Sequence, residues 1–318
     1  MNFYDFTVYK KSKRSYGGNA GLKLGVIIDN ENWFIKFPKS TVGMRNAEIS
    51  YTTSPLSEYL GSQIYKSIGF EVHETRLGSF GDKVVVACKD FREPTEELVE
   101  FRAIKNDYIA GLEEAVTSSS DGGNTQLSTL EYIMNENSTF REMPELKSRF
   151  WNMFVVDALI GNNNRNNGNW GILVNHISEN KRIAPVYDNG AAFSSKLSDG
   201  QIDKIMADEA RFIQSVYQGR TCVFVDDNGN QINPLRYIET TDNKDCVNAV
   251  KRVVCRIDIS KLESIIDDTP ETVGALSVIT KTQKEFYKKC LRYRYEKVLL
   301  PTLKKIKTQE VPLLDPSF

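Results

Sequence analysis

The sequence lacks long apolar runs and closely spaced cysteine pairs, and each absence excludes a class of protein. No stretch of about 18 apolar residues occurs, so no segment is predicted to span a bilayer. A zinc site is not expected, because no C-x-x-C pair is present. An odd, scattered set of cysteines is typical of reduced thiols in a cytosolic protein. The set comprises Cys88, Cys222, Cys246, Cys255 and Cys290.

The N-terminus bears on where the protein is located, and the net charge bears on which partners it can bind. The first residues show no charged-then-apolar signal pattern, so a cytoplasmic protein is expected, and secretion without a classical signal stays open. The net charge is −1, from 41 basic and 42 acidic side chains. This balance argues against nucleic acid or an anionic membrane as a partner. The basic, tyrosine-rich segment 281–300 is interpreted as a solvated helix face.

The order of predicted elements indicates a two-lobed α+β protein. The first ninety residues are β-rich, with strands at 22–28 and 33–37 around a turn, and at 71–77 and 83–88. One helix is predicted between them, with Ser57 as its N-cap and Gly69 after its end. The rest is mainly helical, with an apolar helix at 146–160 and strands at 171–174 and 182–187. We predict an N-lobe at 1–92 and a C-lobe at 93–318.

Several residues in the N-lobe are of the types that bind phosphate. Ser15, Tyr16, Gly17, Gly18 and Asn19 form a glycine-rich segment just before a strand. Glycines let backbone N–H groups approach an anion closely, although a plain turn has the same composition.

A lysine and a glutamate follow this glycine-rich segment. Lys36 lies in an apolar strand, where a kinase keeps its phosphate-binding lysine; the alternative is a solvent-facing lysine. Glu58 could pair with Lys36 or simply favour a helix N-terminus.

The segment 159–171 carries the strongest signal. It joins a predicted helix to a strand, and Asp188 follows about twenty residues later. Asn164 at the place of a hydroxyl acceptor, Asn169 five residues on and a strand-borne Asp188 have the layout of a kinase catalytic loop and metal-binding turn. Amide and carboxylate oxygens suit Mg²⁺. The alternative is an asparagine-rich turn between helix and strand.

With these motifs the chain resembles the HipA-like serine/threonine kinases, which are bacterial. The resemblance rests on 161–171, on 186–190 and on stretches such as 34–38, 85–91, 241–246 and 264–270. It implies an α+β, two-lobed protein-kinase-like fold, ATP and Mg²⁺ as ligands, and a protein substrate. The large extra N-terminal region of longer members is expected to be missing, and an antitoxin-type partner is possible without being indicated.

The resemblance also implies a role for each candidate residue. Lys36 would contact the ATP phosphates, and Asn169 and Asp188 would hold Mg²⁺. The hinge that meets adenine would be Lys89, Asp90 and Phe91. Ser15 would be a site of autophosphorylation. The nucleotide site would further include Tyr16, Gly17, Gly18, Asn19, Glu58 and Asn166.

The chain departs from the family at Asn164, where the family has its catalytic Asp. An amide can orient a hydroxyl but cannot accept its proton, so the sequence predicts Mg-ATP binding with impaired transfer. Three explanations are open: a deliberate inactivating replacement, a natural pseudokinase, or a substitute carboxylate such as Asp157. We favour the first, because the neighbouring parts of the site are intact, and rank Asp157 last as a structural residue.

Three other functions are alternatives to that of a protein kinase. A catalytically silent ATP-binding scaffold would keep the same nucleotide site. Nucleotidyl transfer and small-molecule phosphorylation would use the same parts with a different product or acceptor.

Overall fold

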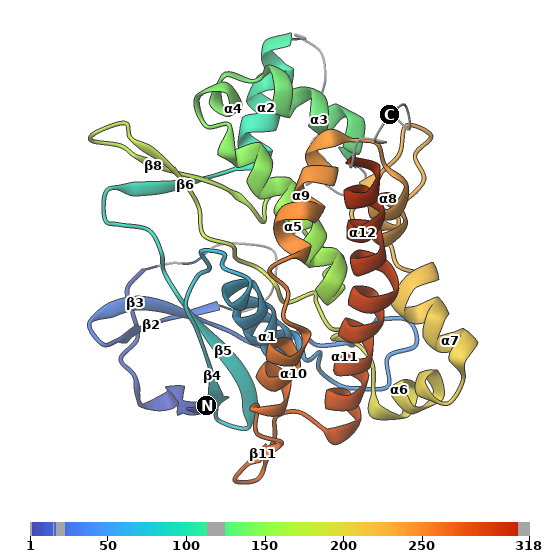
Figure 1. Ribbon diagram of the computed structural model, residues 1–318. Helices are drawn as coiled ribbons and strands as arrows, with labels where there is room; N and C mark the ends of the chain where they lie inside the picture. The colour runs from blue at the N-terminus through green and yellow to red at the C-terminus, as the bar shows by residue number, and fades with distance from the viewer. Residues whose placement is uncertain (1, 15, 17–22, 113–124, 311–318) are drawn as a thin grey trace.

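The N-terminal part of the chain forms a five-stranded sheet with one helix packed against it (Figure 1). The structure is a computed structural model and describes residues 2–14, 16, 23–112 and 125–310. The strands run in the order β1-β4-β5-β3-β2, and β1 pairs with β4 in parallel while the other pairs are antiparallel. Their bounds are β1 Tyr4–Asp5, β2 Lys23–Ile28, β3 Glu31–Lys36, β4 Thr75–Phe80 and β5 Lys83–Lys89.

The predicted hairpin between β2 and β3 is confirmed. Asp29 and Asn30 make its turn with φ angles of 52° and 64°, a left-handed conformation that Asn and Asp tolerate. Strand β4 begins at Thr75, later than predicted. The strand predicted from residue 71 is reduced there to a single bridge, between Val72 and Val186.

Alternation along β3 separates a small core from the face that carries Lys36. Trp33 and Ile35 are fully buried on one face of the sheet, together with Val85 and the η1 residue Phe6 (η1, Phe6–Val8). Because successive side chains of a strand point to opposite faces, Phe34 and Lys36 lie on the other face.

Helix α1 (Ser54–Ser67) covers that second face. Its N-cap is Thr53 and Pro55 stands in its first turn, where proline is well suited, so the predicted start at Ser57 was wrong by one turn. Glu58 therefore lies inside the helix and is 1% exposed. The predicted end is confirmed, because Gly69 adopts φ 95° just past the helix.

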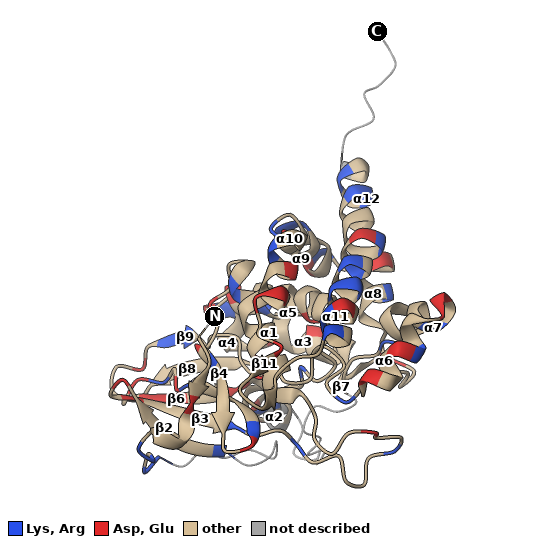
Figure 2. Ribbon diagram, turned by 90° about the horizontal axis from the view of Figure 1, so that it is seen from below, with Lys and Arg blue, Asp and Glu red and all other residues tan. Residues whose placement is uncertain are grey.

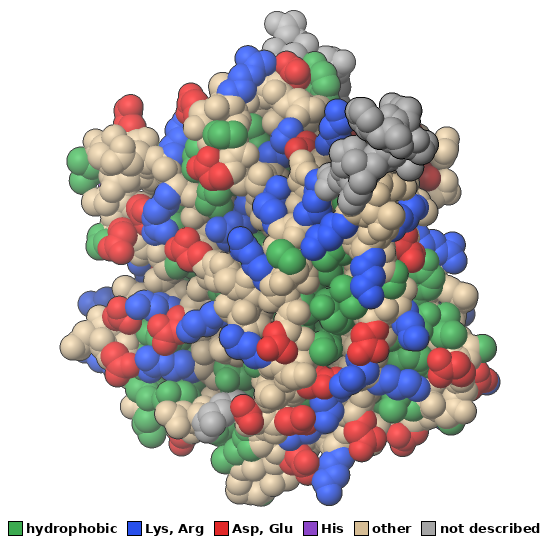
Figure 3. Space-filling model, in the orientation of Figure 1, with side chains coloured by type: hydrophobic (Ala, Val, Ile, Leu, Met, Phe, Trp, Pro, Cys, Tyr) green, Lys and Arg blue, Asp and Glu red, His purple; other side chains and the backbone are tan. Residues whose placement is uncertain are grey.

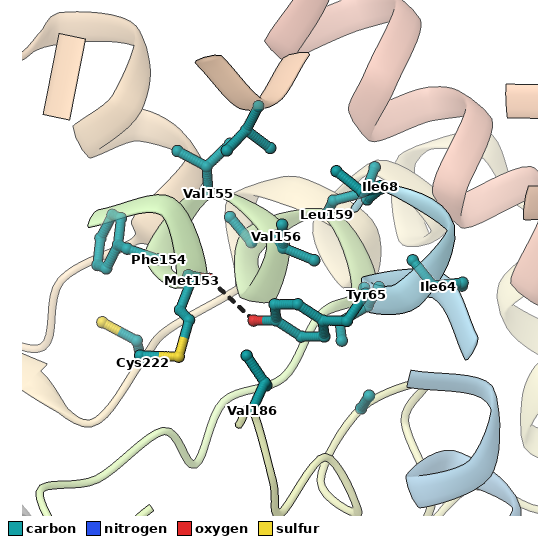
Figure 4. Close-up of a cluster of buried hydrophobic side chains, with 14 of the residues drawn as sticks. Ile64, Tyr65, Ile68, Met153, Phe154, Val155, Val156, Leu159, Val186 and Cys222 are labelled. Atoms are coloured by element: carbon teal, nitrogen blue, oxygen red, sulfur yellow. Dashed lines mark hydrogen bonds between the residues drawn. The ribbon is translucent and has the colours of Figure 1, made fainter. Parts of the chain in front are cut away.

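Helix α1 also belongs to the core of the helical part. Figure 4 shows Tyr65 and Ile68 of α1 packed against Met153 and Leu159 of α5 (Glu145–Ile160). The Tyr65 hydroxyl donates to the Met153 carbonyl oxygen at 3.1 Å. One continuous core thus joins both parts of the chain through α1.

The predicted apolar helix is α5, buried on nearly all sides. It ends at Gly161 with φ 68°, as predicted. A second sheet has the order β6-β8-β9, with β8 as predicted and β9 ending earlier than the predicted 187. The bounds are β6 Glu96–Glu100, β8 Gly171–Asn175 and β9 Lys181–Ile183.

Helices and short strands complete the larger part (Figure 1). The first helices are α2 Phe101–Leu112, α3 Leu127–Glu136, α4 Ser138–Glu142, α6 Asp199–Met206, α7 Glu209–Ile213 and α8 Pro234–Thr240. They are followed by α9 Lys244–Val254, α10 Ile259–Asp267, α11 Lys281–Tyr293 and α12 Leu300–Glu310, with π-helical segments η2 Gln214–Gln218 and η3 Arg294–Leu299. Two-residue strands are β7 Thr125–Gln126, β10 Phe224–Val225, β11 Thr272–Val273 and β12 Leu276–Ser277.

The basic side chains of α11 face solvent and acidic neighbours. Lys288 pairs with Asp267 at 2.7 Å, and Arg292 pairs with Glu263 at 2.6 Å. Figure 2 shows the Lys and Arg positions of α11 in blue. Basic and acidic side chains are also intermingled on the face shown in Figure 3. Within the described residues, no helix has the length and apolar character needed to cross a bilayer.

The close packing of α1 on the turn after β9 gives a testable prediction. A Cβ added at Gly61 would lie 2.7 Å from the Cβ of Asn189, below normal contact. Gly61→Ala should therefore lower the free energy of unfolding by about 1–3 kcal/mol, despite the higher helix propensity of alanine. Urea denaturation measures the change.

The matched control is Lys66→Ala, on the exposed face of the same helix. It should change the free energy of unfolding by less than about 0.5 kcal/mol. A Gly61→Ala protein as stable as the parent would show that α1 and the turn of 187–189, which follows β9, are not in close contact.

Candidate active site

Lys36 stands between two carboxylates that come from distant parts of the chain. Its Nζ lies 2.8 Å from Glu58 Oε2 and 2.8 Å from Asp188 Oδ1. Strand β3 supplies the lysine, α1 the glutamate and the segment after β9 the aspartate. The predicted Lys36–Glu58 pair is confirmed, and Asp188 joins the same cluster.

The backbone at Asp188 is itself unusual. Asp188 has φ 60°, which places it in the left-handed region. Aspartate reaches this region more readily than most residues other than glycine, and outliers of this kind concentrate at functional sites.

A second set of contacts fixes Glu58. Its Oε1 lies 3.0 Å from His73 Nε2 and accepts a hydrogen bond from the Asn189 N–H at 3.0 Å. Possible ligand atoms of Glu58, His73 and Cys88 lie within 4.8 Å of one another, but both Glu58 oxygens already have partners. We therefore interpret the group as support for the ion pair. His73 was missed from the sequence, where it stands outside every motif.

Burial makes this cluster electrostatically strong. Burial alone would lower the pKa of Lys36, but Asp188 and Glu58 outweigh it and hold the pKa above its ordinary value. Burial would likewise raise the pKa of Glu58, and Lys36 and His73 instead lower it. Lys36 and Glu58 are therefore both charged at neutral pH.

Arg165 joins the loop of 161–171 to the turn of 187–189. Its side chain donates to both oxygens of Asp157, at 2.8 and 3.2 Å, and to Asn189 Oδ1 at 2.6 Å. It also donates to the carbonyl oxygens of Asn169, at 3.1 Å, and Tyr187. These contacts use all five N–H donors of a guanidinium group. Burial would lower the pKa of Arg165, but the Asp157 charge offsets this and raises it.

Asp157 makes structural hydrogen bonds, as predicted from the sequence. Besides Arg165, its Oδ1 accepts from Tyr65 Oη at 2.8 Å and from Asn162 Nδ2 at 2.9 Å. It is 5% exposed and does not line the cavity described below. Asp157 is therefore not available to replace a carboxylate at position 164.

Asn164 and Asn169 are linked within their loop. Asn169 Nδ2 donates to the Asn164 carbonyl oxygen at 2.7 Å, and the Asn169 N–H donates to the Asn166 carbonyl oxygen at 2.9 Å. With its amide nitrogen held in this way, Asn169 keeps its Oδ1 for another partner. Asn166 accepts from the Gly168 N–H at 2.8 Å, so it shapes the loop; its contact with nucleotide stays a prediction.

The donor set fits a hard divalent cation. Asp188 offers a carboxylate and Asn169 a neutral amide oxygen, which are the ligands that Mg²⁺ prefers. The Arg165 guanidinium holds the carbonyl oxygens of Asn169 and of Tyr187, the residue before Asp188, so one group places both candidate ligands.

The residues predicted to contact the adenine lie among aromatic and charged side chains. The Tyr16 ring lies 4.8 Å from the Phe34 ring, and Asp90 pairs with Arg14 and Arg92 at 3.1 and 2.9 Å. The Phe91 ring lies 5.6 Å from that of Tyr187, although the Asp90 N–H is already bonded to the Asn32 carbonyl oxygen. The nucleotide contacts predicted for Tyr16, Lys89, Asp90 and Phe91 stay predictions. Ser15, Gly17, Gly18 and Asn19 lie outside the described residues.

A cavity of about 640 Å³ opens beside the charged cluster. Lys36, Glu58, Asn164 and Asp188 line it. The volume is in the range of small-molecule sites. The cavity therefore gives access to the lysine, the candidate metal ligand and the position of the family's catalytic residue at once.

The chain is similar in both sequence and structure to a known kinase. The chain is 36% identical over 300 residues to serine/threonine-protein kinase CtkA of Helicobacter pylori strain J99, covering 94% of this chain and 87% of the relative. A crystal structure of the H. pylori proinflammatory kinase CtkA matches with a TM-score of 0.84 at 33% identity, over 96% of this chain and 99% of that one. No protein-family model matches the chain.

A more distant structure shows the fold alone. HipA of Shewanella oneidensis MR-1, solved with HipB and operator DNA, matches with a TM-score of 0.53 at 12% identity, over 97% of this chain and 70% of that one. The predicted kinase-like α+β fold and the resemblance to HipA-like kinases are thus confirmed. The boundary near residue 92 stays a prediction.

The shifted pKa of Glu58 predicts a pH-dependent stability. Because the folded pKa is lowered, Glu58 stabilises the protein above its unfolded value of about 4.3, and this contribution is lost as pH falls below that value. Glu58→Gln should cost roughly 3–5 kcal/mol of unfolding free energy at pH 7. The difference from the parent should shrink toward pH 3, which denaturant titrations at several pH values would measure.

Glu285→Gln provides the control, because Glu285 is exposed on α11. It should have little effect at any pH. A Glu58→Gln difference that stays constant from pH 7 to pH 3 would contradict the assignment of Glu58 as a charged, paired group.

Proposed function

The chain belongs to the HipA-like serine/threonine kinase family that includes CtkA, and we propose that it binds Mg-ATP and acts as a protein kinase. The reaction is transfer of the ATP γ-phosphoryl group to serine or threonine hydroxyls of a protein, including its own. The observation that carries this proposal is that Lys36 lies within 2.8 Å of both Glu58 and Asp188, in the lining of a cavity that Asn164 also lines.

Each residue of the site has a part in such a transfer. Lys36 binds the phosphate oxygens and neutralises the charge that develops on them, while Glu58 keeps its amino group in place. Asp188 and Asn169 hold Mg²⁺, which when bound adds positive charge at the phosphates. Asn164 lies where the acceptor hydroxyl must be oriented.

Asn164 sets the expected rate. Its amide can hydrogen-bond the hydroxyl but takes no proton, and Asp157 is not available to do so. A general base typically contributes about 10²–10⁴ in rate, so the chain should bind Mg-ATP and transfer phosphate slowly.

Asn164→Asp tests this account. The substitution restores a proton acceptor with almost the same shape, so the rate of autophosphorylation should rise by about 10²–10⁴. Labelling with γ-labelled ATP and Mg²⁺ at matched protein concentration measures it. Affinity for Mg-ATP should change little, because the Lys36 cluster is untouched.

Peptide mapping of the labelled Asn164→Asp protein locates the phosphate. Ser15 is the candidate from the family resemblance, and this part of the proposal fails if Ser15 never gains phosphate. Asn164→Gln is the control, since it adds length but no charge, and it should stay as slow as the parent.

A silent ATP-binding scaffold is the second candidate, and Asn164 itself favours it. In that case Asn164→Asp would bind Mg-ATP yet label neither itself nor added protein. Phosphate transfer by the Asp form would exclude the scaffold.

A further inference from the structure

Besides the Lys36 cluster and Asn164, the cavity is lined by a second group of residues, which we call the basic lining. The group comprises Lys39, Ser194, Ser195, Lys196 and Arg220. Glu58 and Asp188 are the acidic residues among the described residues lining the cavity, and both contact Lys36. The basic lining therefore has three cationic residues and no acidic one.

None of these three cations has a carboxylate at ion-pair distance within the described part of the chain. The acidic residue on the nearby 39–53 segment is Glu48, which contacts Ser198 Oγ and Lys204 and does not line the cavity. By contrast, basic and acidic side chains intermingle on the outer face in Figure 3. The basic lining thus has positive charge that no carboxylate offsets at ion-pair distance within the described residues.

Arg220 lies near a second guanidinium group, that of Arg294. Arg220 donates to the Gly161 carbonyl oxygen and Arg294 to the Leu159 carbonyl oxygen at 3.0 Å, so both lie at the C-terminus of α5. Burial and the neighbouring Arg294 charge lower the pKa of Arg220 to about 10, which leaves it charged at neutral pH. Two full charges exceed the roughly half charge of a helix C-terminus, so positive potential remains.

The cavity wall formed by Ser194 and Ser195 is held in an unusual conformation. Phe193 and Ser194 both have positive φ angles, 55° and 51°. The Phe193 N–H donates to the Ile160 carbonyl oxygen at 3.2 Å, and the Ser195 carbonyl oxygen accepts from the Thr53 N–H at 2.8 Å. Consecutive non-glycine residues in this region cost energy and are maintained where the surrounding contacts fix them. The segment is therefore a fixed wall between the ends of α5 and α1.

We propose that the basic lining of the cavity binds the acceptor protein and selects serine or threonine hydroxyls that have acidic residues beside them. The inference rests on the proposed kinase function, because it names the substrate class of that site. Lys39, Lys196 and Arg220 attract the flanking carboxylates, while Asn164 receives the hydroxyl. Positive charge placed in this way raises both affinity and selectivity for an acidic segment.

Peptide binding tests the inference without requiring catalysis. Fluorescent peptides with one central serine, flanked by Asp, Ala or Lys, are titrated into the unmodified chain with Mg²⁺ and a non-hydrolysable ATP analogue. The acidic peptide should bind about tenfold tighter than the basic one at low salt, and the ratio should fall as salt rises. Equal affinities, or tighter binding of the basic peptide, would overturn the proposal.

Variants show which residues produce the preference for acidic peptides. Lys196→Glu, at an exposed position, should reduce or reverse the acid-to-base ratio, and Arg220→Gln should reduce it. The control Lys305→Glu, exposed on α12, should leave the ratio unchanged. If Lys305→Glu shifts the ratio as much as Lys196→Glu, the preference reflects overall charge and the proposed site is wrong.

The Asn164→Asp protein separates this inference from the kinase proposal. If it phosphorylates peptides without favouring acidic ones, the kinase proposal stands and the acceptor inference fails. If it phosphorylates nothing while acidic peptides still bind at Lys196 and Arg220, the kinase proposal fails and the two residues remain an anion-binding site.

Discussion

The buried guanidinium of Arg165 is the interaction on which the rest of the site depends. It joins α5, through Asp157, to the loop that carries Asn164 and Asn169 and to the turn that carries Asp188. A buried charge is tolerated only when it is paired and its donors are satisfied, and every donor of Arg165 is used. Removing it would leave Asp157 buried without a counter-charge and would release both candidate metal ligands.

Helix α1 extends this constraint to the other part of the molecule. Its buried face packs on α5 through Tyr65, whose hydroxyl also donates to Asp157. The same helix carries Glu58, which pairs with Lys36 of the sheet and accepts from the Asn189 N–H. Lys36, the turn that carries Asp188 and the loop that carries Asn164 and Asn169 thus share one connected set of contacts, and the cavity lies where these elements meet.

Sequence reasoning found the residues whose chemistry and spacing are distinctive. Lys36 in an apolar strand, Asn164 and Asn169 in one loop and Asp188 after a strand could be recognised from order alone. Glu58 was found, but its helix was started at Ser57 because a good capping residue outweighed the signal of Pro55. His73 and Arg165 were missed because their roles depend on partners far away in sequence. A lone arginine in an otherwise neutral asparagine-rich loop was the available signal for Arg165.

The central claim is that the Lys36–Glu58–Asp188 cluster, with Asn169, is a Mg²⁺-dependent nucleotide site. Isothermal titration calorimetry with ATP, with and without Mg²⁺, tests it on the unmodified chain and on Asp188→Asn, which keeps the shape of the side chain but removes its charge. Binding should require Mg²⁺ and should weaken by about tenfold or more in Asp188→Asn. Binding that needs no Mg²⁺, or that is equally tight in Asp188→Asn, would contradict the claim.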